Sequence, residues 1–273
     1  MRLAERAAPT YGAEMSQWSQ GEIYESYVGR WSRLVAAEFV AWLDQPAGLR
    51  WLDVGCGTGA LTTAVLAQAE PSAVVGVDPS EGFIGFARGA VTDERARFEV
   101  LPAAELSTDA VGGAVDVVVA GLVLNFIPDR PDALRRMRQI GRTVGVYVWD
   151  YAEGMQLMRY FWEAAADVVP DDRERDEGRT FPFCNPAGLE GLFAEAGFSD
   201  IETRAIVVPT VFESFDAYWT PFLGGQGPGP AYLRSLHPNT QTAIRHLVES
   251  RLPANPDGSI ELTARAWAAR GTS

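Results

Sequence analysis

The chain has 273 residues, of which 47% are apolar and 22% are charged, as in a globular protein with a sizeable buried core. Its formal net charge is −13 and its 23 basic residues are all arginine, so the acidic chain disfavours nucleic acid and anionic membranes as partners. No apolar run approaches the ~20 residues of a membrane span, the N-terminal stretch lacks a signal core, and the two cysteines form no ligand cluster, so we expect a cytoplasmic protein without a bound metal.

The first 150 residues predict an alternation of helices and buried strands. Apolar side chains at helical spacing predict a helix over residues 20–43. Short apolar runs predict strands at 49–54, 73–77, 98–101, 115–120 and 144–149, with helices at 61–69, 81–87 and 130–140. Because continuous apolar strands alternating with helices indicate a parallel sheet covered on both faces, we expect a doubly wound α/β fold.

After residue 149 this alternation stops. The pattern predicts helices at 151–169, 186–196 and 240–250, a loop at 171–186, and late strands at 201–208 and 260–269. We find no internal repeat and no linker, and interpret residues 1–273 as a single domain. Its parts are a cofactor-binding core at 20–150 and cap elements at 1–45, 151–185 and 212–255.

The turn after the first strand, Asp53-Val54-Gly55-Cys56-Gly57-Thr58-Gly59, is the most informative motif. Three glycines before a helix let the backbone approach a ligand closely, and with Ala60 they also fit the loose fingerprint of dinucleotide sites. Asp53 distinguishes a dinucleotide from S-adenosylmethionine as the ligand, since a carboxylate repels a pyrophosphate but attracts the ammonium and sulfonium of S-adenosylmethionine. At ~4 Å either effect is about 4 kcal/mol. The alternative is that Asp53 only caps a local turn.

Asp78 ends the second predicted strand, 19 residues after Gly59. A carboxylate at this position can accept hydrogen bonds from both hydroxyls of a ribose. Because both candidate ligands contain a ribose, Asp78 indicates a nucleoside site without choosing between them.

Three segments together resemble the class I S-adenosylmethionine-dependent methyltransferases, most closely the branch that acts on ubiquinone, menaquinone and other small molecules. They are the glycine turn, Gly76-Val77-Asp78-Pro79-Ser80, and Val115-Asp116-Val117-Val118-Val119. The resemblance covers roughly residues 20–150. It implies a mostly parallel, seven-stranded sheet with helical cap insertions and an antiparallel last strand near 260–267. It also implies S-adenosylmethionine as cofactor and S-adenosylhomocysteine as product.

The resemblance further implies which residues bind the cofactor. The turn glycines would approach its methionine part, Asp53 its amino group, Asp78 its ribose, and Phe83 one face of its adenine. The complete expected set is Tyr24, Arg30, Trp31, Asp53, Gly55, Cys56, Gly57, Gly59, Asp78, Pro79, Phe83, Pro102, Ala103, Ala104, Ala120 and Leu122. Trp31 and the tyrosines before it have an alternative interpretation as core packing, because they share one helix face.

The chain departs from the family at two positions. Pro102 stands where an Asp often accepts a hydrogen bond from the adenine amino group, and proline has neither a carboxylate nor an N–H. Asn125 stands where a His is frequent, so no general base is carried over from that position.

No general base is assigned from the sequence. The methyl donor is already activated, so positioning supplies much of the catalysis, and a base is needed only for an acceptor that keeps its proton. His237, Asp150 and Tyr151 are the candidates, although His237 and His246 are interpreted first as ordinary surface residues.

We therefore expect methyl transfer to a small, aromatic or apolar metabolite by a monomer or homodimer. The alternatives are a cofactor-binding enzyme of the same fold that does not methylate, such as a cyclase, and a nicotinamide-dependent reductase. Aromatic residues of the cap are expected to wall the acceptor or to pack the cap onto the core, and 224–230 is expected to form a hinge or the edge of a lid. The aromatic residues are Tyr24, Trp31, Tyr151, Tyr160, Phe161, Phe181, Phe183, Phe212, Phe215, Tyr218, Trp219 and Phe222.

Overall fold

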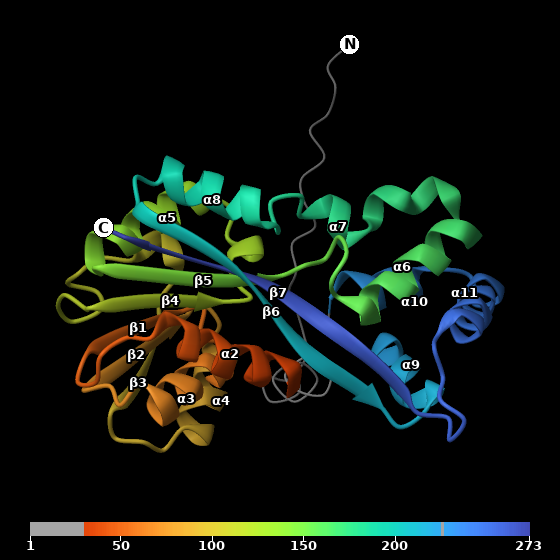
Figure 1. The fold of residues 1–273 in the computed structure, drawn as a ribbon, viewed down its shortest axis with the longest axis horizontal. Coiled ribbons are helices and arrows are strands. Elements are labelled where there is room, and N and C mark those ends of the chain that lie inside the picture. The colour runs from red at the N-terminus through yellow and green to blue at the C-terminus, as the bar shows by residue number, and fades with distance from the viewer. Residues whose placement is uncertain (1–29, 225–226) are drawn as a thin grey trace, which may run out of the picture.

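Residues 30–224 and 227–273 are described by the structure, a computed structural model, drawn in Figure 1. Within this range one seven-stranded sheet runs through the molecule in the order β3-β2-β1-β4-β5-β7-β6. The strands are β1 (Arg50–Val54), β2 (Ala73–Asp78), β3 (Ala96–Val100), β4 (Val117–Gly121), β5 (Thr143–Trp149), β6 (Ser199–Phe212) and β7 (Ile260–Thr272). The first five strands are parallel, and β7 pairs antiparallel with both β5 and β6. The expected fold class is confirmed.

Helices cover both faces of this sheet, as Figure 1 shows. Helices α2 (Arg30–Leu43), α3 (Ala60–Gln68) and α4 (Glu81–Ala90) lie on one face, and α5 (Arg130–Ile140) and α8 (Pro186–Glu195) lie on the other. This double covering explains why β1, β2, β4 and β5 are buried along nearly their whole length.

Local sequence sets where these helices begin and end. Ser80 caps α4 by accepting a hydrogen bond from the Phe83 N–H, and Asp129 and Asn185 cap α5 and α8 in the same way. Gly197 follows α8 with a φ of +85°, the left-handed conformation that favours glycine after a helix.

The cap forms around the part of the antiparallel β6–β7 pair that extends beyond β5 (Figure 1). Its helices are α6 (Gln156–Val168), α7 (Glu177–Thr180), α9 (Phe215–Gly224), α10 (Pro228–Ser235) and α11 (Pro238–Arg251), with the 3-10 helix η4 (Pro170–Arg175). The expected loop at 171–186 is therefore wrong in part, because η4 and α7 occupy much of it. Both late strands are longer than expected. Strand β6 extends to Phe212 by pairing with β7 past the edge of β5, and β7 extends to Thr272 by pairing with β5.

The segment expected as a hinge is mostly helical in the described residues. Helix α9 continues to Gly224, and α10 begins at Pro228 and includes Pro230. Residues 225–226, which complete the hinge prediction, lie outside the described residues.

The aromatic residues of the cap mostly contact one another. The Phe161 and Phe222 rings are stacked with centroids 4.5 Å apart, and Trp162 lies 5.3 Å from Tyr232. The hydroxyl of Tyr218 donates to the Leu157 carbonyl at 2.7 Å. These side chains are almost completely buried and none of them lines the described cavity at the glycine turn, so the packing interpretation holds for them.

Candidate functional site

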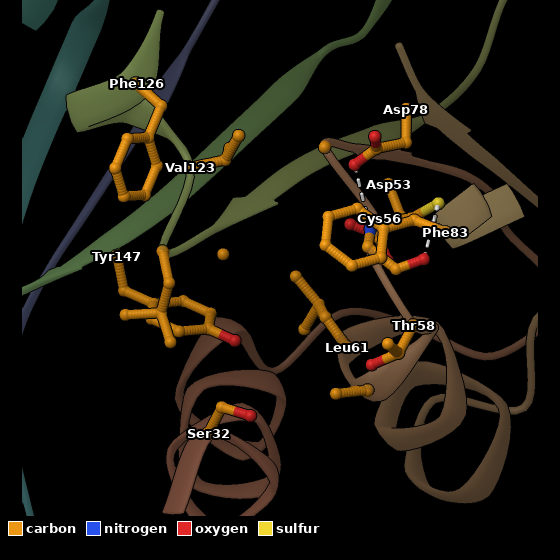
Figure 2. A pocket seen from close by; sticks show the side chains of 15 residues that line it. Ser32, Asp53, Cys56, Thr58, Leu61, Asp78, Phe83, Val123, Phe126 and Tyr147 are labelled. Carbon is orange, nitrogen blue, oxygen red and sulfur yellow. Dashed lines mark hydrogen bonds between the residues drawn. The ribbon is translucent and has the colours of Figure 1, made fainter. Parts of the chain in front are cut away.

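A cavity opens at the carboxyl ends of the central parallel strands, where the chain leaves β1 for β2 on one side and β4 lies on the other. Such a switch in strand order leaves a crevice that open α/β sheets use to bind ligands. The residues lining it are Ser32, Asp53, Gly55, Cys56, Gly57, Thr58, Ala60, Leu61, Asp78, Phe83, Gly121, Leu122, Val123, Phe126 and Tyr147. Figure 2 shows Asp78 and Phe83 on one side of this cavity, with Val123 and Phe126 across from them.

The glycine turn forms the floor of the site by folding back onto β2. The N–H groups of Gly55 and Cys56 both donate to the Val77 carbonyl, at 2.7 and 3.0 Å. Gly55 has a φ of +70°, and a Cβ atom there would overlap the side chain of Val123. The turn therefore requires glycine for its conformation and for the close approach of the loop after β4.

Asp53 is completely buried at the end of β1 and borders the cavity. Its Oδ2 accepts a hydrogen bond from the Thr62 hydroxyl at 2.7 Å, but within residues 30–224 and 227–273 its Oδ1 has no partner. Burial is the main cause that raises the pKa of Asp53 to about 7. A buried carboxylate with an unpartnered oxygen is costly, and a cationic donor entering the cavity would supply the missing bond.

Asp78 is held at the end of β2 by the backbone. Its Oδ2 accepts from the Gly57 N–H at 3.1 Å and its Oδ1 from the Ser80 N–H at 2.9 Å, while burial raises the pKa of the carboxyl. Each carboxylate oxygen has a further lone pair, so this anchored group can still accept hydrogen bonds from two ligand hydroxyls.

The loop after β4 closes the opposite side of the cavity. Leu122 has a φ of +57°, which is rare for a residue with a Cβ, and its N–H donates to the Tyr147 carbonyl at 2.8 Å. Gly121 leaves room for the Tyr147 hydroxyl, since a Cβ there would overlap it. This local strain brings Leu122 and Val123 to the cavity.

Seven of the expected cofactor residues line the cavity, namely Asp53, Gly55, Cys56, Gly57, Asp78, Phe83 and Leu122. The burial of the Cys56 thiol raises its pKa well above the ordinary value, which fits a small packing residue and not a nucleophile.

Other expected residues lie elsewhere. Six are not part of the described lining, namely Gly59, Pro79, Pro102, Ala103, Ala104 and Ala120. Trp31 is buried with its ring edge against Phe212 at 5.4 Å, as in core packing. Tyr24 lies outside the described residues, and Arg30 is described only as the first residue of α2.

None of the three candidate bases belongs to the described lining. The exposed His237 side chain accepts from the Asn239 N–H at the start of α11, so it acts as a helix cap. Asp150 is buried in an ion pair with Arg265 at 2.5 Å. Tyr151 is buried as well, and it contacts Asn125 rather than the glycine turn.

Several lining residues escaped the sequence analysis. Val123 and Phe126 lie in the segment that follows β4, so the predicted position of that strand could have identified them as lining residues. Ser32 and Tyr147 come from α2 and β5, and only the packing of those elements brings them to the cavity (Figure 2).

In the described part of the chain, no helix is long and apolar enough to cross a membrane. The same residues contain no group of three or more His, Cys, Asp or Glu side chains that could hold a metal ion.

Comparisons with known proteins relate this geometry to a family. A family described as a methyltransferase domain matches residues 52–146. The demethylmenaquinone methyltransferase of Symbiobacterium thermophilum is 28% identical over 240 residues, which cover 77% of this chain and 88% of that protein. The trans-aconitate 2-methyltransferase of Deinococcus radiodurans is 30% identical, covering 62% of this chain and 66% of that protein.

A solved structure shows the same fold. It is phosphoethanolamine N-methyltransferase 2 of Haemonchus contortus in complex with phosphomonomethylethanolamine and S-adenosylhomocysteine. The TM-score is 0.54 at 16% identity, with 94% of this chain and 58% of that chain covered.

Proposed function

The chain belongs to the class I S-adenosylmethionine-dependent methyltransferases, and we propose that it methylates a small, flat, largely aromatic metabolite beside Phe126 and Val123. The observation that carries the proposal is the unpartnered oxygen of Asp53 at the glycine turn. A dinucleotide would place negative phosphates against this oxygen, whereas S-adenosylmethionine offers a positive ammonium group.

The residues of the cavity fit this cofactor. Asp53 would receive its amino group, and the anchored carboxylate of Asp78 would accept from its ribose hydroxyls. Phe83, which lies next to Asp78 in Figure 2, would cover its adenine. The glycines let the backbone approach without side-chain overlap.

When bound, S-adenosylmethionine supplies an activated methyl group. The acceptor would take this methyl group with a lone pair of electrons, and the proton that the acceptor loses would pass to water, leaving S-adenosylhomocysteine as the second product. The chain itself contributes orientation and the exclusion of water, through the apolar walls Leu61, Val123 and Phe126.

A small-molecule acceptor agrees with the charge of the protein. The net charge of −13 disfavours a nucleic-acid acceptor. The name of the Symbiobacterium thermophilum relative denotes an acceptor with a flat ring system, which suits a wall formed by Phe126. We take the acting form to be a cytoplasmic monomer or homodimer, and light scattering coupled to size-exclusion chromatography measures its mass.

The first experiment is calorimetric titration of the purified protein with S-adenosylmethionine, S-adenosylhomocysteine and NAD. We expect the first two to bind and NAD not to bind. Tight binding of NAD alone would reject the proposal in favour of the reductase.

The second experiment uses cofactor with a radiolabelled methyl group and a panel of phenols, indoles, quinols, tRNA and a peptide. We expect label in a small aromatic acceptor. Label in tRNA or peptide alone would reject the proposed acceptor class, and cofactor binding with acceptor conversion but no label transfer would support the cyclase alternative.

A further inference from the structure

Asn125 is a buried polar residue whose side chain is incompletely bonded. It lies in the 3-10 helix η3 (Leu124–Phe126), between the lining residues Val123 and Phe126, and it is only 4% exposed. Its Nδ2 donates to the Tyr151 hydroxyl over a long 3.4 Å, and its Oδ1 has no partner among the residues that the structure describes. A buried amide oxygen without a donor costs free energy, and a ligand donor would recover that cost.

The backbone around Asn125 is held firmly. Arg130 donates to the carbonyls of Leu124 and Asn125 at 3.2 and 3.3 Å, and its guanidinium stacks on the Phe183 ring at 4.4 Å. The backbone that carries the Asn125 side chain is therefore held in place by the fold, as a recognition group requires.

Aromatic rings connect this amide to the cavity. The Tyr151 ring lies 5.4 Å from Phe181, and Phe181 lies 6.2 Å, edge-on, from Phe126. Phe126 lines the cavity and is 63% exposed, so its ring presents an apolar surface to the cavity and stands two ring contacts away from Tyr151, the hydrogen-bond partner of Asn125. Flat rings pack well against such a surface.

The charges near this surface disfavour an anion. Asp53 and Asp78 both line the cavity, and the described lining contains no basic side chain. The described arginines near this surface are already engaged. Arg130 donates to the Leu124 and Asn125 carbonyls and stacks on Phe183. Arg265 pairs with Asp150 at 2.5 Å, and Arg159 pairs with Asp176 at 2.8 Å. A carboxylate acceptor would lose its hydration here without gaining a cation.

On these grounds we propose that Asn125 recognises the methyl acceptor, and that this acceptor is a flat, apolar molecule carrying an un-ionised hydroxyl group. The hydroxyl donates to the Asn125 Oδ1. An alkylamine would be held as an ammonium among the carboxylates and would lack the lone pair that takes a methyl group. Because an amide is not basic enough to remove a proton, Asn125 binds the acceptor and does not act as a base.

This inference rests on the proposed function, since it assigns the acceptor of that reaction. The test uses the full chain saturated with S-adenosylhomocysteine and three matched probes, 2-naphthol, 2-methoxynaphthalene and 2-naphthoate, titrated by calorimetry. The ether lacks the donor and the naphthoate carries the negative charge, while all three share the same ring.

We expect 2-naphthol to bind about tenfold or more tightly than either other probe, because a site built for a hydroxyl rejects analogues without one. Asn125→Leu should reduce the preference for naphthol over the ether to about twofold. Asn125→Asp keeps an acceptor oxygen and should retain that preference. The control Asn239→Leu changes an exposed asparagine on α11 and should leave it unaltered.

Several outcomes would overturn the inference: equal or tighter binding of 2-naphthoate, an unchanged naphthol preference in Asn125→Leu, or binding of none of the probes. If Asn125→Leu does not fold, the affinities of the wild-type protein for the three probes still test the inference. Absence of S-adenosylhomocysteine binding would overturn the proposed function itself, whereas normal binding without discrimination among the probes overturns only the role of Asn125.

Discussion

The cavity at the glycine turn and the aromatic cluster around Phe161 in the cap differ in how fully their buried groups are satisfied, although the Thr210 hydroxyl, on the part of β6 beyond β5, also finds no partner among the described residues. Asp53 and Asn125 are buried at or near the cavity, and in the described part of the chain each keeps one oxygen without a partner. In the cap, Phe161 and Phe222 are stacked, and the buried hydroxyl of Tyr218 reaches the Leu157 carbonyl. Unsatisfied polar groups are costly and indicate a ligand site, whereas a filled aromatic interior indicates a scaffold.

The largest expected effect tests whether the cap is a scaffold. Phe161→Ala removes a completely buried ring that contacts Trp162, Trp219 and Phe222, and it should lower the free energy of unfolding by about 3–5 kcal/mol. The affinity for S-adenosylhomocysteine of the folded fraction should remain nearly unchanged. Urea unfolding and calorimetry measure the two quantities, and a stable variant that loses cofactor affinity would place the ring in the binding site instead.

The next effect concerns the floor of the cavity. Gly55→Ala combines a left-handed φ with overlap against Val123, and it should weaken cofactor binding by about 3 kcal/mol, roughly a hundredfold. The matched control is Gly57→Ala, where φ is +53° but the added Cβ meets nothing within 4 Å, and it should cost about 1 kcal/mol. Replacing Val123 by Gly in the Gly55→Ala background removes all the overlapping side-chain atoms and should restore part of the affinity. Equal losses in the two glycine variants would contradict the overlap argument.

Asp53 gives a smaller effect that depends on pH. Because burial raises the pKa of Asp53 to about 7 in the free protein, raising the pH from 6 to 8 ionises the group and should tighten cofactor binding. The stability of the free protein changes in the opposite direction with pH. The pKa of Asp53 in the folded protein lies above the unfolded value of 3.8, so the free energy of unfolding decreases as the pH rises from about 4 toward 7.

Asp53→Asn should weaken cofactor binding at pH 8 by about 2 kcal/mol and remove both pH dependences. Titrations of the two proteins at several pH values measure the effect. A wild-type affinity that does not vary with pH would show that the amino group of the cofactor binds elsewhere.

His237 gives the smallest expected effect. Since its side chain caps α11 on the exposed surface, His237→Ala should lower the free energy of unfolding by about 0.5–1 kcal/mol and leave turnover unchanged. A general base, by contrast, contributes at least about a hundredfold to the rate. A decrease in turnover of that size with unchanged stability would instead indicate that His237 is the general base.

Much of the fold and part of the site could be predicted before the structure was known. The five parallel strands follow from apolar runs, and Asp53, the turn glycines and Asp78 follow from their places at strand ends. Phe126 and Tyr147 were missed because their approach depends on how β4, β5 and the loop after β4 pack. The adenine contacts expected at Pro102–Ala104 remain a prediction, since these residues do not line the described cavity.

The sequence alone determined the strand and helix order and the ligand chemistry of the glycine turn. Hydrophobic periodicity and turn residues act locally, within a few positions of the chain, so their effect can be predicted from the sequence without knowledge of the fold. Only the tertiary structure decided that Phe126 faces the cavity while Phe161 is buried in the cap, and that Asp53 and Asn125 each keep an unpartnered oxygen. The burial of a side chain and its hydrogen bonds depend on atoms that distant segments of the chain place against it. Two residues of the same type therefore cannot be distinguished in these respects from their neighbouring sequence.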